Sequence, residues 1–283
     1  MEYYPVYWIK SEPGLINQRR HSVLPDSYLN GVSFTSYSHS SFFYFCLMGQ
    51  KKLQRFGELK TFSNVLEYPE NMQGQWQHFF KNDNPLVLEL ACGKGEYAVG
   101  LGRLHPHKNF IGIDIKGNRM WVGAKTALHD GLHNVAFVRT QIQKLTEYFA
   151  AGEVSEIWIT FPDPQLRNGK AKKRLTHPRF LRLYKTILAE GGMINLKTDS
   201  PDLYDFTKQV ISLFGLHLVT DDEDVYAREN IGDDLLIKTH YEGLDIAGSN
   251  RIHYLRFELD KPMPEELDEQ LKALVSEEAV DRG

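Results

Sequence analysis

Four carboxylates stand at or just after the ends of short apolar runs in this chain. They are Glu89, Asp114, Asp163 and Asp199. Short apolar runs of this kind predict buried strands of a parallel sheet. Because parallel strands end at the same edge of their sheet, we expect these acids to face a common crevice, where ligands of such sheets bind. Carboxylates in a crevice attract cationic groups and accept hydrogen bonds from hydroxyl and amine groups.

The rest of the chain is arranged around the apolar run 86–90 and the glycines that follow it. Gly93 and Gly95 predict a sharp turn, after which the apolar spacing becomes helical. Gly93-x-Gly95-x-x-Ala98 fits the dinucleotide fingerprint, although so short a pattern also occurs by chance. Glu89 would repel a pyrophosphate and favour a ligand with an ammonium and a sulfonium, such as S-adenosylmethionine. The alternative is that Glu89 is a solvated charge at a strand end.

Two further polar residues follow predicted strands at positions suited to a nucleoside. Asp114 lies 19 residues beyond Gly95, near the spacing at which an acid accepts hydrogen bonds from ribose hydroxyls. An acid there is also an ordinary helix cap, which is the alternative. Gln141 follows the predicted strand 135–138, and its amide suits an adenine edge or the ribose.

Asp163 stands between two prolines in Phe161-Pro-Asp-Pro164. Each proline ring fixes its own φ and restricts the residue before it, so the bracket predicts a stiff loop that holds the acid at the sheet edge. A simple surface turn is the alternative. A basic stretch follows over residues 167–179, and we expect it to lie beyond Asp163, outside the glycine-turn cradle. Its cations are Arg167, Lys170, Lys172, Lys173, Arg174 and Arg179.

The composition limits the possible partners of this basic stretch. The chain has 283 residues, of which 42% are hydrophobic, and a net charge of −4. A nucleic-acid role therefore requires a local basic patch, and phosphate contact is favoured over a solvated face for residues 167–179. Cys46 and Cys92 form neither a zinc pattern nor a disulfide framework, so we expect a cytoplasmic protein without a bound metal. No run approaches the ~18 apolar residues of a membrane span, and we expect no membrane partner.

The chain divides into three parts by composition. Residues 1–47 are rich in serine, tyrosine and phenylalanine, and we expect them to be disordered or to precede the true start of translation. Met48 begins a stretch that resembles a natural bacterial start, and a genuine aromatic extension is the alternative. We expect one large domain over residues 48–262 and an acidic tail, a fraying peripheral helix, over residues 263–283.

From residue 86 to about residue 215, predicted strands and helices alternate, which is typical of a doubly wound parallel sheet. The chain here resembles the bacterial tRNA (guanine-N7-)-methyltransferase family over roughly residues 56–259. The resemblance rests on motifs that generic methyltransferases share only in part. They are Glu89-Leu-Ala-Cys-Gly-Lys-Gly, Gly112-Ile-Asp114, Phe161-Pro-Asp-Pro164, residues 172–174, Lys197-Thr-Asp199 and Thr239-His-Tyr-Glu242.

The resemblance implies a Rossmann-like class I methyltransferase fold, with seven strands of which the last is antiparallel. It implies methylation by S-adenosylmethionine of N7 of the guanine at tRNA position 46, in the variable loop. By position, Asp163 matches the candidate catalytic residue. The cofactor-contacting positions are Glu89, Asp114, Gln141 and Asp163, beside the turn glycines Gly93 and Gly95. The substrate-contacting positions are Arg167, Asp199, Thr239, His240, Tyr241 and Glu242. The RNA-contacting positions are Gly169, Lys170, Ala171, Lys172, Lys173 and Arg174.

Three residues depart from the family pattern. Gln165 replaces a common Trp, a change that bears on the packing of the loop. Gln141 replaces a common acid or Asn, a change that bears on the strength of cofactor binding. Arg167 replaces Lys, a mild change because both cations bind phosphate.

Other functions remain open at this stage. They are a class I methyltransferase acting on another RNA, a small molecule or a protein, a nicotinamide-dependent dehydrogenase, and an RNA-binding protein without catalysis. The basic stretch opposes a small-molecule substrate, and Glu89 opposes a dehydrogenase. The sequence leaves open the choice between a monomer and a homodimer.

Overall fold

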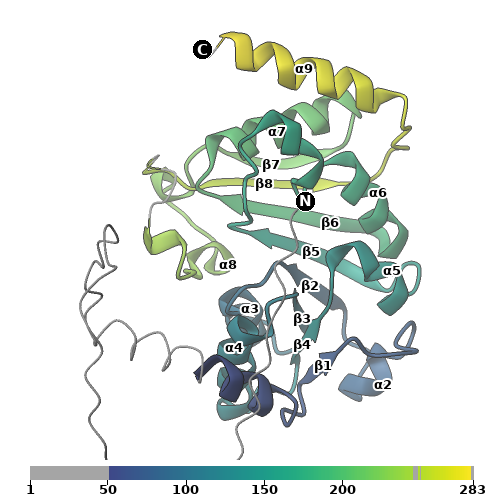
Figure 1. The fold of residues 1–283 in the computed structure, drawn as a ribbon, viewed down its shortest axis with the longest axis vertical. Helices are drawn as coiled ribbons and strands as arrows, with labels where there is room; N and C mark the ends of the chain where they lie inside the picture. The colour runs from purple at the N-terminus through teal and green to yellow at the C-terminus, as the bar shows by residue number, and fades with distance from the viewer. Residues whose placement is uncertain (1–50, 245–247, 249, 282–283) are drawn as a thin grey trace, which may run out of the picture. The chain divides into compact units, whose positions relative to one another are not determined.

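Strand β2 (Leu86–Leu90) lies at the point where the direction of the sheet reverses. All five of its residues are buried. In the computed structural model, β2 pairs in parallel with β3 (Asn109–Asp114) on one side and β5 (Val154–Thr160) on the other (Figure 1). The chain continues outward from β3 on one side and from β5 on the other. The carboxyl ends of β2 and β5 therefore flank the crevice in which doubly wound sheets bind ligands.

The structure describes residues 51–244, 248 and 250–281, which belong to one unit running from Phe45 to Gly283. The expectations for residues 1–47 and for a start at Met48 lie outside the described residues. The strands of the sheet stand in the order β1-β4-β3-β2-β5-β6-β8-β7. The bounds of the other strands are Val65–Glu67 for β1, Val135–Arg139 for β4, Leu188–Thr198 for β6, Leu218–Asp222 for β7 and His253–Glu258 for β8.

The predicted sheet is confirmed, with one addition. β8 runs antiparallel to both β6 and β7, as expected for the last strand of a seven-stranded sheet. The eighth strand is β1, which pairs in parallel with β4 at the edge of the sheet. β1 has three half-buried residues, too few to show a period of two, and therefore left no recognisable pattern in the sequence.

Helices cover both faces of the sheet, as the alternation of buried side chains along the strands requires (Figure 1). Leu86, Leu88 and Leu90 pack on one face, whereas Val87 packs on the other. The first face carries α2 (Trp76–Phe80), α5 (Leu145–Tyr148), α6 (Pro178–Ile187), α7 (Pro201–Leu213) and α9 (Leu267–Asp281). The second face carries α3 (Glu96–Leu104), α4 (Gly117–His129) and α8 (Asp233–Leu236). Short 3-10 helices are η1 (Ile142–Lys144), η2 (Asn168–Lys173), η3 (Val225–Ala227) and η4 (Glu242–Leu244).

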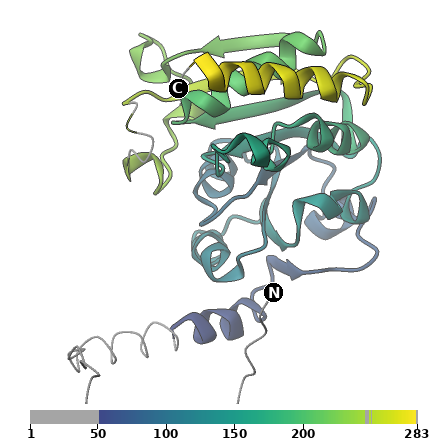
Figure 2. The ribbon, with the colours of Figure 1, turned by 45° about the horizontal axis from the view of Figure 1, so that its top comes forward.

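The acidic C-terminal segment packs against this core. Helix α9 lies beside α7, and Leu271 and Val275 are buried in the same cluster as the sheet residues (Figures 1 and 2). At its start, Arg182 of α6 donates to Asp268 at 2.6 Å and to the carbonyl of Met263. Residues 263–276 are therefore part of the packed domain, although their charges predicted a peripheral tail.

Candidate active site

The turn after β2 is held in a backbone conformation that requires glycine. Gly93 and Gly95 have φ of 55° and 73°, and Ala91 has φ of 56°. A Cβ on Gly95 would lie 2.4 Å from the Phe137 ring, a distance that real Cβ atoms do not show. Gly95 then caps α3. The predicted strand, glycine turn and helix are all present, and the turn places backbone N–H groups at the edge of the crevice.

Glu89 is buried inside the domain, which excludes its interpretation as a solvated strand-end charge. Its side chain lies against α3, and the residue is only 4% exposed. One carboxyl oxygen accepts from Ala98 N at 2.8 Å, and the other accepts from Thr160 Oγ1 at 3.0 Å. Burial raises the pKa of Glu89 to about 8, which the two hydrogen bonds oppose. Glu89 thus ties the first turn of α3 to the end of β5, and its contact with a cofactor stays a prediction.

A cavity of about 440 Å³ opens beside the ends of β3 and β4. Asp114 lies in its wall, with one oxygen accepting from Gly93 N at 2.9 Å and the other from Lys116 N at 2.8 Å. Each oxygen keeps a second lone pair for a ligand hydroxyl. The other lining residues are Ala91, Ile115, Thr140, Gln141, Ile142, Gln143, Lys172, Lys173, Leu175, Arg179 and Phe180. Apolar walls with a few convergent polar groups are typical of small-ligand sites.

Thr140 is a residue of this cavity to which the sequence assigned no role. Its hydroxyl is buried and has no hydrogen-bond partner among the described residues. Its backbone N–H donates to the carbonyl of Asp114 at 3.1 Å, so the residue lies beside the end of β3 in the wall of the cavity. A buried, unpaired hydroxyl is costly unless a ligand or water satisfies it. Its place beside Gln141 after a strand was the one available signal in the sequence.

The loop that carries Asp163 is held in an uncommon backbone conformation. Phe161 and Gln165 have φ of 46° and 49°, left-handed values that cost non-glycine residues roughly 1–3 kcal/mol each and cluster at functional sites. Asp163 is exposed, and one of its oxygens accepts from Gln165 N at 3.0 Å. The loop begins at the end of β5, where Phe161 N donates to the carbonyl of Lys197 at 2.8 Å. Asp163 therefore presents a carboxylate at the carboxyl edge of the sheet.

Arg174 differs from its predicted role. Its side chain is turned into the protein, and the residue is 4% exposed. Its guanidinium donates to the carbonyls of Pro164 at 3.2 Å and Gln165 at 3.4 Å, and it lies 4.5 Å from the centre of the Phe206 ring. This position contradicts the prediction that Arg174 contacts RNA. Arg174 instead holds the far end of the Asp163 loop, including the position at which Gln165 departs from the family pattern.

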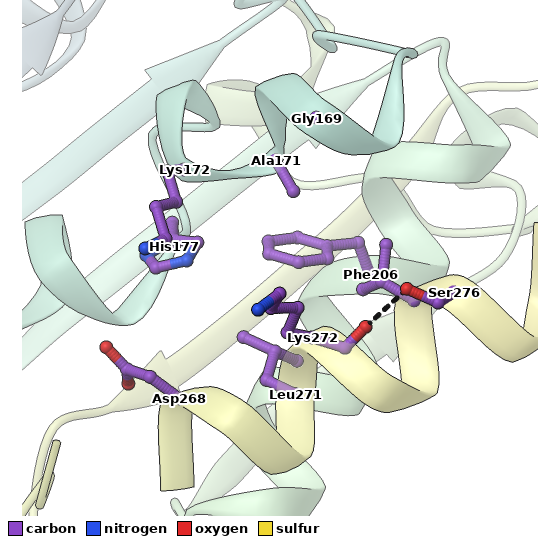
Figure 3. Close-up of a pocket in the computed structure, with 10 residues that line it drawn as sticks. Gly169, Ala171, Lys172, His177, Phe206, Asp268, Leu271, Lys272 and Ser276 are labelled. Atoms are coloured by element: carbon purple, nitrogen blue, oxygen red, sulfur yellow. Dashed lines mark hydrogen bonds between the residues drawn. The ribbon is translucent and has the colours of Figure 1, made fainter. Parts of the chain in front are cut away.

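The basic stretch forms η2 and divides into an outer and an inner part. Arg167, Gly169 and Lys170 are exposed, whereas Ala171 is half-buried against the core. Figure 3 shows the inner side, where η2, α7 and α9 enclose a cavity of about 250 Å³ that includes Ala171 and Phe206. Lys172 and Lys173 line the 440 Å³ cavity together with Asp114. This corrects the expectation that these two lysines lie outside the cradle.

The segment Thr239–Glu242 lies over the glycine turn. The Tyr241 ring would be 3.7 Å from a Cβ on Gly93, and His240 N donates to Glu96 Oε1 at 3.3 Å. Thr239 is buried, and its hydroxyl accepts from Glu242 N at 3.2 Å. The Glu242 carboxylate is only 5% exposed, because it is directed at Lys197 and Tyr226. Asp199 stands half-buried just after β6. The structure thus gathers the predicted residues at one sheet edge, with the Glu242 carboxylate facing inward.

The described residues contain neither a metal-ligand cluster nor a helix suited to a membrane. Within residues 51–244, 248 and 250–281, no group of three or more His, Cys, Asp or Glu side chains is arranged to hold a metal ion. No helix in the same residues combines the length and the apolar composition that a membrane crossing needs. Cys92 is a buried free thiol whose pKa burial raises, which makes it inert.

The sheet order and the glycine turn define a methyltransferase of the Rossmann-like class. Residues 83–253 match a family model described as a putative methyltransferase. The crystal structure of the 16S rRNA methyltransferase KamB is similar in fold, with a TM-score of 0.51 and 14% identity, covering 69% of this chain and 96% of that one.

Curated relatives place the chain within this class. The tRNA (guanine-N(7)-)-methyltransferase of Porphyromonas gingivalis is 50% identical over 218 residues, covering 72% of this chain and 88% of the relative. That of Christiangramia forsetii is 48% identical over 223 residues, covering 75% of this chain and all of the relative. That of Geobacillus kaustophilus is 35% identical over 189 residues, covering 67% of this chain and 86% of the relative. The chain therefore belongs to the tRNA (guanine-N7-)-methyltransferase family.

Proposed function

We propose that this chain transfers a methyl group from S-adenosylmethionine to N7 of a guanine in tRNA, at position 46 of the variable loop. The observation that carries the proposal is the 50% identity to a relative named for guanine-N7 methylation of tRNA. The site supports it, because an exposed carboxylate, a glycine turn and a nucleoside-sized cavity meet at one sheet edge.

The cavity beside β3 and β4 fits the adenosyl part of the cofactor. Asp114 has free lone pairs for ribose hydroxyls, and the amide of Gln141 suits an adenine edge. Ile115 and Phe180 offer apolar contact to the ring. When bound, S-adenosylmethionine supplies an electrophilic methyl group on a sulfonium. The buried acid Glu89 lies beneath the glycine turn, where its negative form would favour the cationic ligand.

The chain's own residues would act by positioning and electrostatics. Guanine N7 carries a free lone pair in neutral RNA, so no base has to deprotonate it. The methylated ring gains positive charge, which a nearby carboxylate stabilises. Asp163 and Asp199 suit this role, because a carboxylate also accepts hydrogen bonds from guanine N1–H and the exocyclic amine. A covalent cysteine intermediate is unnecessary.

Contact with the tRNA would fall to the outer part of the basic stretch. Arg167 and Lys170 are exposed directly after the Asp163 loop, and the backbone of Gly169 is open between them. Lys172 and Lys173 would contact both the cofactor and the tRNA, since they line the cavity. Such cations bind phosphate with an affinity that falls as the salt concentration rises. We place the reaction in the cytoplasm, where a tRNA substrate is found.

Labelled S-adenosylmethionine with total tRNA, followed by nucleoside analysis and mapping, tests this proposal. The expected product is 7-methylguanosine at position 46. Label in another nucleoside or another RNA would overturn the site assignment, and label that stays with small molecules or protein would overturn the substrate class. Cofactor binding without any transfer would favour an RNA-binding protein without catalysis.

A further inference from the structure

A buried lysine lies between the two loops that carry the proposed substrate contacts. Lys197 stands near the end of β6, and its side chain is 0% exposed. Its ammonium donates to the carbonyls of Leu235 at 2.8 Å and Ile237 at 3.1 Å. It also donates to Glu242 Oε2 at 3.1 Å. A lysine ammonium has three donors, so the segment from α8 to η4 accepts all of them.

The same lysine also contacts the Asp163 loop. Its ammonium lies 5.6 Å from the centre of the Phe161 ring and 5.3 Å from that of Tyr97 in α3. The backbone carbonyl of Lys197 accepts from Phe161 N at 2.8 Å. The hydroxyl of Tyr226 donates to the other oxygen of Glu242. The Lys197 ammonium lies 5.7 Å from the centre of the Tyr226 ring. One residue thus links β6, the start of the Asp163 loop and the Thr239–Glu242 segment.

A charge in this position needs a reason beyond stability. A fully buried ammonium loses its hydration, and a buried ion pair often stabilises a protein no better than apolar side chains of the same volume. Burial lowers the pKa of Lys197, while Glu242 opposes that shift. Hydrogen bonds from a charged donor are directional and fix their acceptors more tightly than apolar packing does. The three acceptors lie within residues 235–242, the stretch that ends in the Thr239–Glu242 segment over the glycine turn.

We propose that Lys197 is a positioning residue that fixes the Thr239–Glu242 segment over the glycine turn and aligns it with the Asp163 loop. The target base would then enter between two loops whose separation the lysine sets. The proposal rests on the proposed function for its kinetic consequences. Its structural consequence, the order of residues 235–242, is independent of any substrate.

Hydrogen–deuterium exchange tests the structural consequence, with Lys197→Met as the variant and Tyr254→Phe as the control. Tyr254 pairs with Lys197 across β6 and β8, is equally part of this buried face, and loses one hydrogen bond to Asn195 in the variant. We expect faster exchange over residues 235–242 in Lys197→Met than in the parent. In Tyr254→Phe, exchange over these residues should equal that of the parent. Equal exchange in Lys197→Met and the parent overturns the proposal.

Single-turnover methylation tests the kinetic consequence, with each variant assayed at the same margin below its own melting temperature. We expect the single-turnover rate constant to fall between about tenfold and a hundredfold in Lys197→Met, as for a misplaced reacting group. Tyr254→Phe should stay within about threefold of the parent. An equal loss in both variants would indicate a role in folding alone and would overturn the proposal.

Glu242→Gln extends the test if Lys197→Met does not fold, because it leaves the two carbonyl acceptors of Lys197 in place. On its own, Glu242→Gln should also speed exchange over residues 235–242, and unchanged exchange there would overturn the proposal. Where Lys197→Met does fold, the double variant should be no slower than the slower single variant, since both act through one contact. Fully additive losses would overturn the proposal. If the parent itself methylates no tRNA, the proposed function fails, while the exchange experiment still decides the role of Lys197.

Discussion

Two carboxyl groups at neighbouring strand ends, Glu89 and Asp163, have opposite environments. Glu89 is buried and its pKa is raised to about 8, whereas Asp163 is exposed on a strained loop. The difference divides their roles. A buried carboxyl that holds a helix turn in place supports the site, and an exposed carboxylate at the crevice is free to meet a substrate.

Asp163→Asn is expected to reduce methyl transfer by a factor of about 10² to 10³, as for the loss of one electrostatic contact to a transition state. The amide keeps the hydrogen bond from Gln165 N, so the loop should keep its shape. Steady-state kinetics with tRNA give the loss. Asp83→Asn, which makes the same charge change at the opposite edge of the sheet, is the matched control. A turnover within a few-fold of the parent would mean that Asp163 shapes its loop and has no electrostatic role in the reaction.

Glu89→Gln should change how stability depends on pH. Glutamine resembles the protonated acid, since it can accept from Ala98 N and donate to Thr160 Oγ1. The folded pKa of about 8 lies above the reference value of 4.5, so between these values the folded parent binds more protons than the unfolded chain. Its free energy of unfolding should therefore fall relative to the variant as pH rises, by up to about 1.4 kcal/mol per pH unit.

Denaturant unfolding of both proteins at pH 5.5, 6.5 and 7.5 measures this difference. The two curves of stability against pH should diverge in that window, and a further measurement about one unit above the folded pKa should find them parallel. Parallel curves throughout would mean that Glu89 ionises in the folded state as it does in the unfolded chain.

At the scale of elements, local patterns predicted some parts of the site and missed others. The strand, glycine turn and helix after Pro85 were predictable because each signal lies within a few residues of the next. The Asp163 loop was predictable because its two prolines restrict the backbone on their own. The inward turn of Arg174 was not, because it depends on the Phe206 ring, which comes from a helix far along the sequence. No local pattern distinguishes Lys197 from the rest of its motif, since its acceptors lie about forty residues later.

Helix α9 illustrates how charge can hide a packed element. Its acids predicted a fraying tail, yet Leu271 and Val275 recur at a helical spacing and pack on α7 beneath η2. Helix α9 therefore belongs to the scaffold that holds the basic stretch in place (Figure 3).

Leu271→Ala should lower the free energy of unfolding by about 2–4 kcal/mol, the usual cost of a large-to-small change in a core. Leu271 is 2% exposed, whereas Leu274 in the same helix is 39% exposed. Leu274→Ala is therefore the matched control, and we expect it to cost less than about 1 kcal/mol. Chemical denaturation gives both values. If both variants lose the same small amount of free energy of unfolding, α9 is a peripheral tail, as its charges predicted.

The whole molecule poses an electrostatic question, because a chain of net charge −4 is proposed to bind a polyanion. Its attraction must come from the position of a few cations rather than from the overall field. A test of this idea needs control variants that remove cations away from the proposed RNA contacts. Lysines on the helix over residues 51–59 are not suitable for such variants, since this helix packs on α4 through the Glu58–Trp121 hydrogen bond at 2.9 Å. Lys272 is unsuitable too, because it lines the cavity beneath η2.

The last prediction compares two double variants of equal charge. Arg167→Gln with Lys170→Gln removes the two exposed cations next to the Asp163 loop, and Lys81→Gln with Lys261→Gln removes two exposed cations at the opposite sheet edge. Each pair changes the net charge from −4 to −6. The first pair should weaken tRNA binding and flatten the slope of log affinity against log salt by up to about 1.8.

Cofactor affinity should be nearly unchanged in both pairs, because none of the four residues lines the cavity beside Asp114. Filter binding of tRNA at several salt concentrations gives the slopes, and calorimetry gives the cofactor affinity. The second pair should keep the parental slope, because a charge far from the RNA releases no counterions from it. Equal flattening in the two pairs would mean that the overall field alone governs tRNA binding and that the basic stretch has no special place in it.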